Sequence, residues 1–182
     1  DLQISVIDEL PPGRKPIVTV HCYKENRGKL YGWVEQELRA GRQAYFVYPL
    51  IEESATLDLE SLEVGYQRLK EVYPHYQVAM VHGRMPPEEK EVAMQAFASG
   101  KAQILVSTTV IEVGVDVPNA SVMVIEEAQR FGLSQLHQLR GRVGRGAEKS
   151  YCFLVTDYKL GKESKVRIDT MVQTNDGFKI AE

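Results

Sequence analysis

The sequence predicts an α/β fold built on a parallel sheet. Short apolar runs rich in β-branched and aromatic residues alternate with longer stretches whose apolar residues recur every three or four positions. This alternation is typical of βαβ units, in which a helix crosses over between two parallel strands. The run from Gln43 to Pro49 is short and mostly apolar, as expected for a strand buried on both faces of its sheet.

Six strands and five helices are expected. The strands are residues 17–23, 43–49, 77–82, 104–107, 121–125 and 150–156, and the helices are residues 27–40, 59–73, 86–99, 133–140 and 163–174. The helical residues expected in the core are Leu30, Trp33, Val34, Leu38, Leu62, Tyr66, Leu69, Tyr73, Ala93, Met94, Phe97, Ile168, Met171 and Val172.

The first helix has Asn26 as its expected N-cap, and Gly41 ends it. Parallel sheets bind ligands at the carboxyl ends of their strands. His82, Thr108 and Asp157 each lie just past an expected strand, so this edge is the expected location of the site.

Three parts of the chain are expected. Residues 1–16 contain three prolines and Gly13, which exclude a helix, so we interpret them as a linker or entry arm. Residues 17–158 form the main domain, and residues 159–182 begin a C-terminal helical extension. Because the chain opens without Met and stops soon after an alternating apolar pattern begins, we expect it to be a piece of a longer protein.

The composition is that of an ordinary globular domain, with 43% hydrophobic and 26% charged residues in 182. The net charge of −3 excludes a strongly basic chain. Residues 129–182 nevertheless carry 10 Lys and Arg against 6 Asp and Glu, whereas residues 1–128 carry 12 against 19. Positive charge is therefore concentrated in the C-terminal part, which is compatible with a phosphate partner there.

Membrane and metal roles are not expected. No apolar run approaches the roughly 20 residues of a membrane span, and the start has no signal-peptide pattern. Cys22 and Cys152 lack the spacing of metal ligands, so we expect both to be reduced residues on strands. This cysteine usage fits a cytosolic protein.

The most informative motif is the stretch from Gln138 to Arg145. Arg142 and Arg145 lie three residues apart, and each follows a glycine. The planar guanidinium matches phosphate oxygens, and glycine allows a ligand to approach closely. The motif therefore predicts a site that meets a triphosphate from one side, with a solvated basic loop as the alternative.

A second motif, T-x-x-x-x-x-G-x-D, spans residues 108–116. The two motifs, in this order and spacing, resemble motifs V and VI of the second RecA-like domain of superfamily 2 helicases. The stretches 5–16, 131–137 and 175–181 also resemble the RecG family of bacterial fork-remodelling DNA helicases. The resemblance covers nearly the whole chain and implies a three-layer RecA-like fold in a bacterial cytoplasmic protein.

The resemblance implies roles for five residues around ATP. Arg142 and Arg145 would reach the γ-phosphate as arginine fingers, and Gln138 would orient the phosphate or the attacking water. Gly114 would let the backbone approach the phosphates, and Asp116 would accept hydrogen bonds from ribose hydroxyls. The plainer alternatives are a helix-surface role for Gln138 and a turn role for Asp116.

It also implies a DNA surface. Thr108 would contact the nucleic-acid backbone. His82 and Gly83 would form a second contacting turn, beside Arg84. A hydroxyl and the free backbone N–H groups of such a turn suit phosphate contacts. A structural role for His82 stays open.

A further translocation element follows motif VI in this family. His137, Arg140 and Arg167 would belong to the polar network that links this element to motif VI. Simple solvation of Arg167 on a helix is the alternative.

Only half of an ATPase site is expected in this chain. It contains neither a G-x-x-x-x-G-K-[ST] phosphate loop nor an Asp-Glu-x-x box for Mg²⁺. ATP and Mg²⁺ are the implied cofactors, with Mg²⁺ ligands expected from a first motor domain outside the chain. We therefore predict that this chain alone binds ATP and DNA weakly and does not hydrolyse ATP.

The implied function is that of the C-terminal motor domain of an ATP-dependent double-stranded DNA translocase, which remodels stalled forks and Holliday junctions in recombination and repair. The implied partners are branched or duplex DNA and the first motor and wedge domains of the same parent chain. A transcription-repair coupling factor and a non-catalytic binding module remain alternatives. A DEAD-box helicase is less favoured, because Gln138 stands where that family has His.

Overall fold

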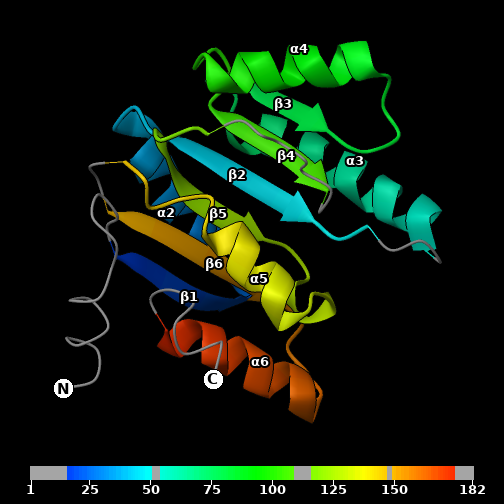
Figure 1. Ribbon diagram of the computed structural model, residues 1–182, viewed down its shortest axis with the longest axis vertical. Coiled ribbons are helices and arrows are strands. Elements are labelled where there is room, and N and C mark those ends of the chain that lie inside the picture. The colour runs from blue at the N-terminus through cyan, green and yellow to red at the C-terminus, as the bar shows by residue number, and fades with distance from the viewer. Residues whose placement is uncertain (1–15, 51–53, 109–115, 147–148, 175–182) are drawn as a thin grey trace.

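The computed structural model describes residues 16–50, 54–108, 116–146 and 149–174 (Figure 1). In this part of the chain six strands form one parallel sheet in the order β1-β6-β5-β2-β4-β3. The strands are β1 (Ile17–Tyr23), β2 (Gln43–Tyr48), β3 (Val78–Val81), β4 (Ile104–Thr108), β5 (Ala120–Ile125) and β6 (Ser150–Thr156). All six expected strands are confirmed.

Within the described ranges there are five helices, also as expected; four lie between strands, and the fifth follows the last strand. They are α2 (Arg27–Arg39), α3 (Ala55–Val72), α4 (Pro87–Ala98), α5 (Leu133–Arg140) and α6 (Lys162–Gln173), with short 3₁₀ turns at η1 (Lys24–Asn26) and η3 (Ala128–Arg130). Helix α3 begins at Ala55 rather than at the expected residue 59. Asn26 occupies the N-cap of α2 without a side-chain capping bond, because the 3₁₀ turn η1 leads directly into the helix.

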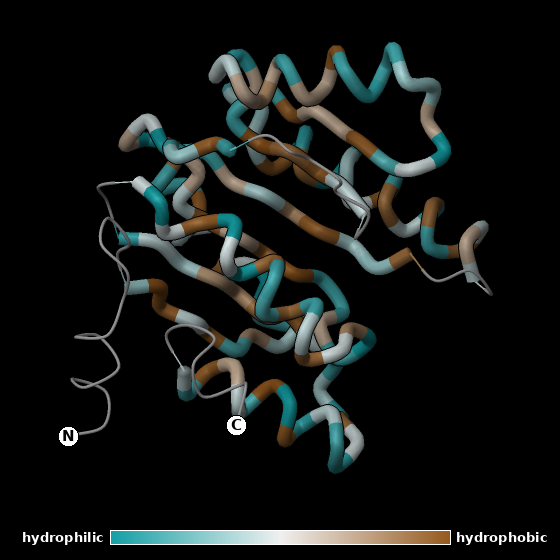
Figure 2. Tube along the Cα trace, in the orientation of Figure 1, coloured by the Kyte–Doolittle hydropathy of each residue, from teal (hydrophilic) through white to brown (hydrophobic). Residues whose placement is uncertain are grey.

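Helices cover both faces of the sheet. Helices α2 and α3 pack on one face, and α4, α5 and α6 pack on the other (Figure 1). The central strands β2, β4 and β5 are buried at every residue, and Figure 2 shows them as the hydrophobic middle of the molecule. The expected three-layer α/β fold is confirmed. No helix in the described ranges is long and apolar enough to cross a bilayer.

Two residues that we expected in the core lie at its margin. Trp33 is 50% exposed, and its ring lies against Tyr151 and Phe153, with centroids 5.5 and 6.5 Å away. Val172 is 38% exposed. Both lie on the flank of an amphipathic helix, beside rather than on the row that faces the sheet, so the helical period alone assigned them wrongly.

Candidate nucleotide and nucleic-acid sites

The arginine motif forms the end of α5 and the loop after it. The N–H of Gly132 donates to Oε1 of Gln135 at 3.0 Å where α5 begins. After the helix, the side chain of Val143 is fully buried in the core, and Gly144 has a φ of 87°, which favours glycine. The buried valine and the left-handed turn fix the loop on the sheet, with Arg142 half-buried and Arg145 exposed.

Arg145 faces Asp116. Its Nη1 lies 3.6 Å from Oδ1 of Asp116, and its Nε donates to the carbonyl of Gly141 at 3.3 Å. The side chains of Arg145 and Asp116 are 47% and 58% exposed. An exposed ion pair contributes only about 0–1 kcal/mol, so an incoming phosphate can replace this carboxylate at little cost. The arginine is held in place and stays accessible.

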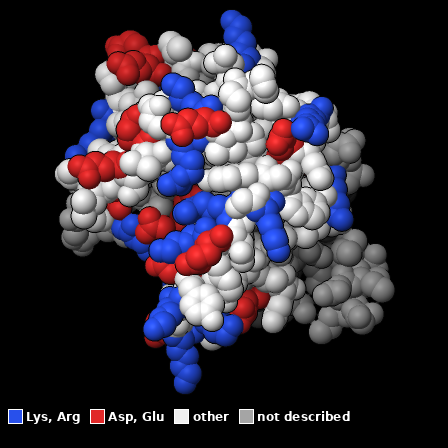
Figure 3. All heavy atoms as spheres, turned by 180° about the vertical axis from the view of Figure 1, so that it is seen from behind, with Lys and Arg blue, Asp and Glu red and all other residues white. Residues whose placement is uncertain are grey.

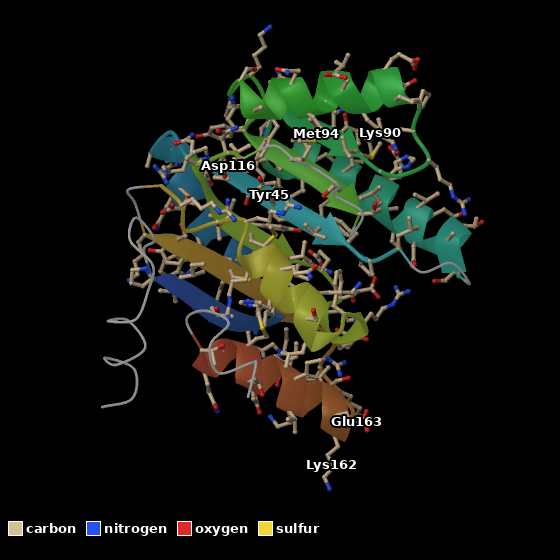
Figure 4. The ribbon with its side chains drawn as sticks, in the orientation of Figure 1. Tyr45, Lys90, Met94, Asp116, Lys162 and Glu163 are labelled. Carbon is tan, nitrogen blue, oxygen red and sulfur yellow. The ribbon has the colours of Figure 1, made fainter. Side chains whose placement is uncertain are left out.

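Tyr45 on β2 marks where the charged groups converge. The pKa of Tyr45 is raised to about 12, chiefly by burial; the charges of Arg142 and Arg145 lower it, and the charge of Asp116 raises it. All three charged side chains are therefore close to one phenol. Figure 4 shows Asp116 and Tyr45 on the same side of the sheet. The sequence predicted Tyr45 only as part of a buried strand, and no signal in the sequence distinguishes it from Tyr48.

The arginine loop lies toward the amino ends of the strands, contrary to the expected carboxyl edge. A Cβ on Gly146 would collide with the carbonyl of Pro118 and closely approach the guanidinium of Arg42. Pro118 directly precedes β5, and Arg42 directly precedes β2. The rule about carboxyl ends misplaced the arginines, because the loop after α5 returns along the face of the sheet before β6 begins.

The residues predicted to contact DNA do lie at the carboxyl edge. Thr108 is the last residue of β4, and His82 directly follows β3. The hydroxyl of Thr108 is fully buried and has no hydrogen-bond partner within the described residues. It is therefore not on the surface here, and its predicted phosphate contact stays a prediction.

The turn after β3 uses part of its hydrogen-bonding capacity internally. The N–H of Arg84 donates to Nδ1 of His82 at 3.2 Å, and the N–H of Met85 donates to the carbonyl of His82 at 3.2 Å. The N–H of His82 itself donates to Sδ of Met85 at 3.3 Å, so the expectation of free N–H groups in this turn is wrong for His82 and for the neighbouring Arg84. Burial, followed by the charge of Lys90, lowers the pKa of His82, so a neutral ring keeps Nε2–H as a donor. Gly83 and Arg84 are exposed.

The two sets of residues thus lie at opposite ends of the strands. Arg142, Arg145 and Asp116 form one site, and Gln138 is exposed on α5. The predicted DNA contacts lie at the other end. Gly114 lies outside the described residues.

Arg140 has a different environment from the other two arginines of the motif. It is 1% exposed, and its Nη1 donates to the carbonyls of Met171 and Thr174 at 2.8 and 2.6 Å. The same guanidinium donates to the hydroxyls of Thr19 and Thr174, each at 3.1 Å. Carbonyls at the end of a helix have no partner in the helix itself, and a cation there is favourable. Arg140 therefore caps α6 and ties it to α5 and β1.

Helix α6 is part of the same core. Ile168 and Met171 are fully buried against the sheet. Arg167 donates to the carbonyl of Gln129 at 2.9 Å, and His137 is half-buried on α5. These contacts place α6 beside the arginine motif, while its role in translocation stays a prediction.

Two bidentate ion pairs between arginine and a buried carboxylate at the carboxyl edge were missed by the sequence analysis. Arg27 donates to both carboxylate oxygens of Glu126, which is 1% exposed, at 2.6 and 3.2 Å. Arg130 donates to both oxygens of the buried Asp58. The partners are separated by 99 and 72 positions, too far for any local pattern to pair them. Within the described ranges no three His, Cys, Asp or Glu side chains are grouped as a metal site requires.

Comparison with known proteins defines the class. Residues 29–147 match the family model of the helicase conserved C-terminal domain, so the chain belongs to this family.

The sequence is also similar to RecG over the whole chain, as the motifs predicted. It is 52% identical to the ATP-dependent DNA helicase RecG of Synechocystis, 52% to that of Thermotoga maritima and 50% to that of Escherichia coli, with 100% of the chain covered each time. The chain spans only 22%, 23% and 26% of these relatives.

Solved structures agree. A RecG structure bound to a three-way DNA junction matches 95% of this chain and 22% of that chain, with 47% identity and a TM-score of 0.79. The yeast DEAD-box splicing factor Prp28 matches 91% of this chain and 34% of that chain, with a TM-score of 0.69 at 18% identity, which shows a shared fold alone.

Proposed function

We propose that this chain is the second motor domain of an ATP-dependent DNA translocase that acts on branched DNA. The RecG relatives are named ATP-dependent DNA helicases, and one was solved on a three-way junction. The substrates are stalled forks and Holliday junctions. The partners are a first motor domain and a wedge domain of the same longer protein.

The exposed Arg145, together with the half-buried Arg142 on the same loop, carries the proposal. Phosphoryl transfer requires positive charge at the transferring group, and an arginine finger contributes about 10³–10⁵ in rate. Here a loop anchored by Val143 holds Arg145 next to Asp116, at 3.6 Å. Asp116 would accept hydrogen bonds from ribose. Gln138 is exposed one helical turn away and would orient the phosphate or the water.

The other half of the ATP site lies outside this chain. The phosphate loop and the Mg²⁺ ligands come from the first motor domain, which closes on the arginine loop. DNA lies on the opposite edge, against His82, Gly83 and Arg84, with Thr108 beneath. Arg140, Arg167 and His137 connect the motor to the translocation element that begins with α6. The longer protein works in the bacterial cytoplasm.

A chimera tests this proposal. The matching segment of Thermotoga maritima RecG is replaced by this chain, and DNA-stimulated ATP hydrolysis and three-way-junction unwinding are measured. The chimera is expected to retain both activities, and the double variant Arg142→Ala, Arg145→Ala is expected to lose them while it still binds nucleotide. A folded chimera without junction unwinding contradicts the proposed function.

The chain alone is expected to bind ATP weakly and not to hydrolyse it. Turnover by the purified chain above background, abolished by Arg145→Ala, contradicts this division of the site. Nothing in the comparisons favours the transcription-repair coupling factor, and binding of the parent to RNA polymerase is the observation that favours it.

A further inference from the structure

An apolar groove runs along the free edge of the sheet, at β3. It has a volume of about 440 Å³ and is lined by Ala79, Met80, Met85, Glu88, Glu89, Val92, Ala93 and Ala96. Helix α4 lies beyond β3 at this edge of the sheet (Figure 1). The groove is separate from the arginine loop and is not used by the proposed function.

The floor of the groove is an unpaired strand. Within the described part of the chain, β3 pairs with β4 alone, and its other edge has no strand beside it. Ala79 packs toward α4 and Met80 toward α3, so the pleat of β3 alternates across this edge. Such an edge carries unpaired N–H and C=O groups that can take up another strand.

Helix α4, which covers the groove, lines it with apolar residues at one end and acidic residues at the other. Val92 is 69% exposed, although it lines the groove together with Ala93 and Ala96. Glu88 and Glu89 lie in the first turn of α4, next to the carboxyl end of β3. Among the described residues that line the groove, only these two are charged, so the groove favours a cation at that end and disfavours a phosphate backbone.

We propose that this groove binds an extended protein segment, which adds to β3 as an extra strand and carries basic residues opposite Glu88 and Glu89. β3 has four residues, so an added strand places alternate small apolar side chains under α4. Ladder hydrogen bonds supply affinity, and the apolar row and the acidic end supply selectivity. The acidic lining favours a protein segment over nucleic acid.

The test is a titration of this chain with fluorescein-labelled peptides. KKTVTVT and TVTVTKK place the lysines at the acidic end for antiparallel and parallel addition. EETVTVT reverses the charge, and KKTPTPT keeps the charge but cannot complete the ladder, because proline has no N–H. One lysine peptide is expected to bind at least tenfold more tightly than both controls, and to shift the amide NMR signals of Val78 to Val81.

Matched variants locate the binding. Val92→Ser is expected to weaken the peptide about fivefold through lost apolar contact, and Glu88→Lys with Glu89→Lys about tenfold through reversed charge. Val64→Ser and Glu60→Lys change exposed residues of α3 outside the groove and are expected to leave binding unchanged. Circular dichroism confirms that each variant is folded.

The proposal is overturned if neither lysine peptide saturates, if KKTPTPT binds equally well, or if the α3 variants weaken binding as much as the α4 variants. Displacement of the peptide by duplex DNA also overturns it, because the groove would then belong to a nucleic-acid surface.

Discussion

Arg140 and Arg145 belong to one short motif, yet the fold gives them opposite environments. Arg140 is 1% exposed and makes four hydrogen bonds to Thr19, Met171 and Thr174. Arg145 is 47% exposed and faces one exposed carboxylate across 3.6 Å. One guanidinium holds the end of a helix, and the other is available to a ligand. Residue type and spacing indicate a cationic motif, whereas burial decides which guanidinium stays exposed to a ligand.

The face of the sheet opposite the arginine loop has mixed charge. Seen from the side of α2 and α3, acidic and basic side chains are interspersed rather than gathered in a patch of one sign (Figure 3). The arginine loop follows α5, which packs on the other face, so its arginines are distinguished by their local partners.

The largest expected effect is the difference in unfolding free energy between alanine variants of Arg140 and Arg145. Arg140→Ala leaves the carbonyls of Met171 and Thr174 without their donor inside the core and is expected to cost about 3 kcal/mol of unfolding free energy. Arg145→Ala removes one exposed pair and is expected to cost less than about 1 kcal/mol. Urea unfolding of both variants measures the difference. Equal losses contradict the assignment of Arg140 as structural.

Two helical glycines allow a similar comparison between a closely packed position and an open one. Gly65 in α3 lies against the buried ring of Tyr48, which a Cβ would overlap, whereas Gly32 in α2 has open space around it. Gly65→Ala is expected to lose about 2 kcal/mol to overpacking, and Gly32→Ala to gain about 1 kcal/mol of helix propensity. Thermal unfolding gives the sign of each change. A stabilised Gly65→Ala contradicts the close approach.

A substitution at Thr108 tests the effect of its buried hydroxyl, which lies at the edge predicted to contact DNA. Its hydroxyl has no partner within the described residues, so the isosteric Thr108→Val is expected to raise the unfolding free energy by about 1 kcal/mol. If Thr108 contacts DNA in the longer protein, the chimera with this change binds DNA more weakly despite its stability. A destabilised Thr108→Val contradicts the structural part of this prediction.

His21 gives a smaller, pH-dependent effect. The hydroxyl of Thr156 donates to the carbonyl of Asp157, so Nε2–H of His21 donates to that hydroxyl at 2.7 Å. Burial lowers the pKa of His21, Asp169 opposes this shift, and Lys165 adds to it. The unfolded chain therefore binds a proton more readily, and stability is lost as pH falls through about 6.5 toward the lower folded pKa.

His21→Gln keeps a donor and removes this titration. Urea midpoints at neutral and mildly acidic pH are expected to differ less in the variant than in the original chain. An unchanged difference shows that His21 does not carry the effect.

The fold was largely predictable from the sequence, because strand and helix patterns are local. Six strands and five helices were found close to their expected bounds, and the two motifs identified the family. The flank positions of Trp33 and Val172 were not predictable, because the helical period does not show how far the sheet extends beneath a helix.

The sequence predicted which residues come together in the candidate site, but not where on the sheet they lie. The sequence named Arg142, Arg145 and Asp116, yet placed them at the wrong end of the strands. Their position depends on contacts such as that of Gly146 with Pro118, which are distant in the chain. The burial of Arg140 likewise depends on α6 docking onto β1.

The most direct test of the central claim is ATP hydrolysis by the Thermotoga maritima chimera with Arg145→Ala, measured together with its thermal unfolding midpoint. The account predicts a fall in turnover of at least about 10³ with an unchanged midpoint. Turnover within tenfold of the unaltered chimera, or a loss explained by unfolding, would contradict the assignment of Arg145 to the phosphate.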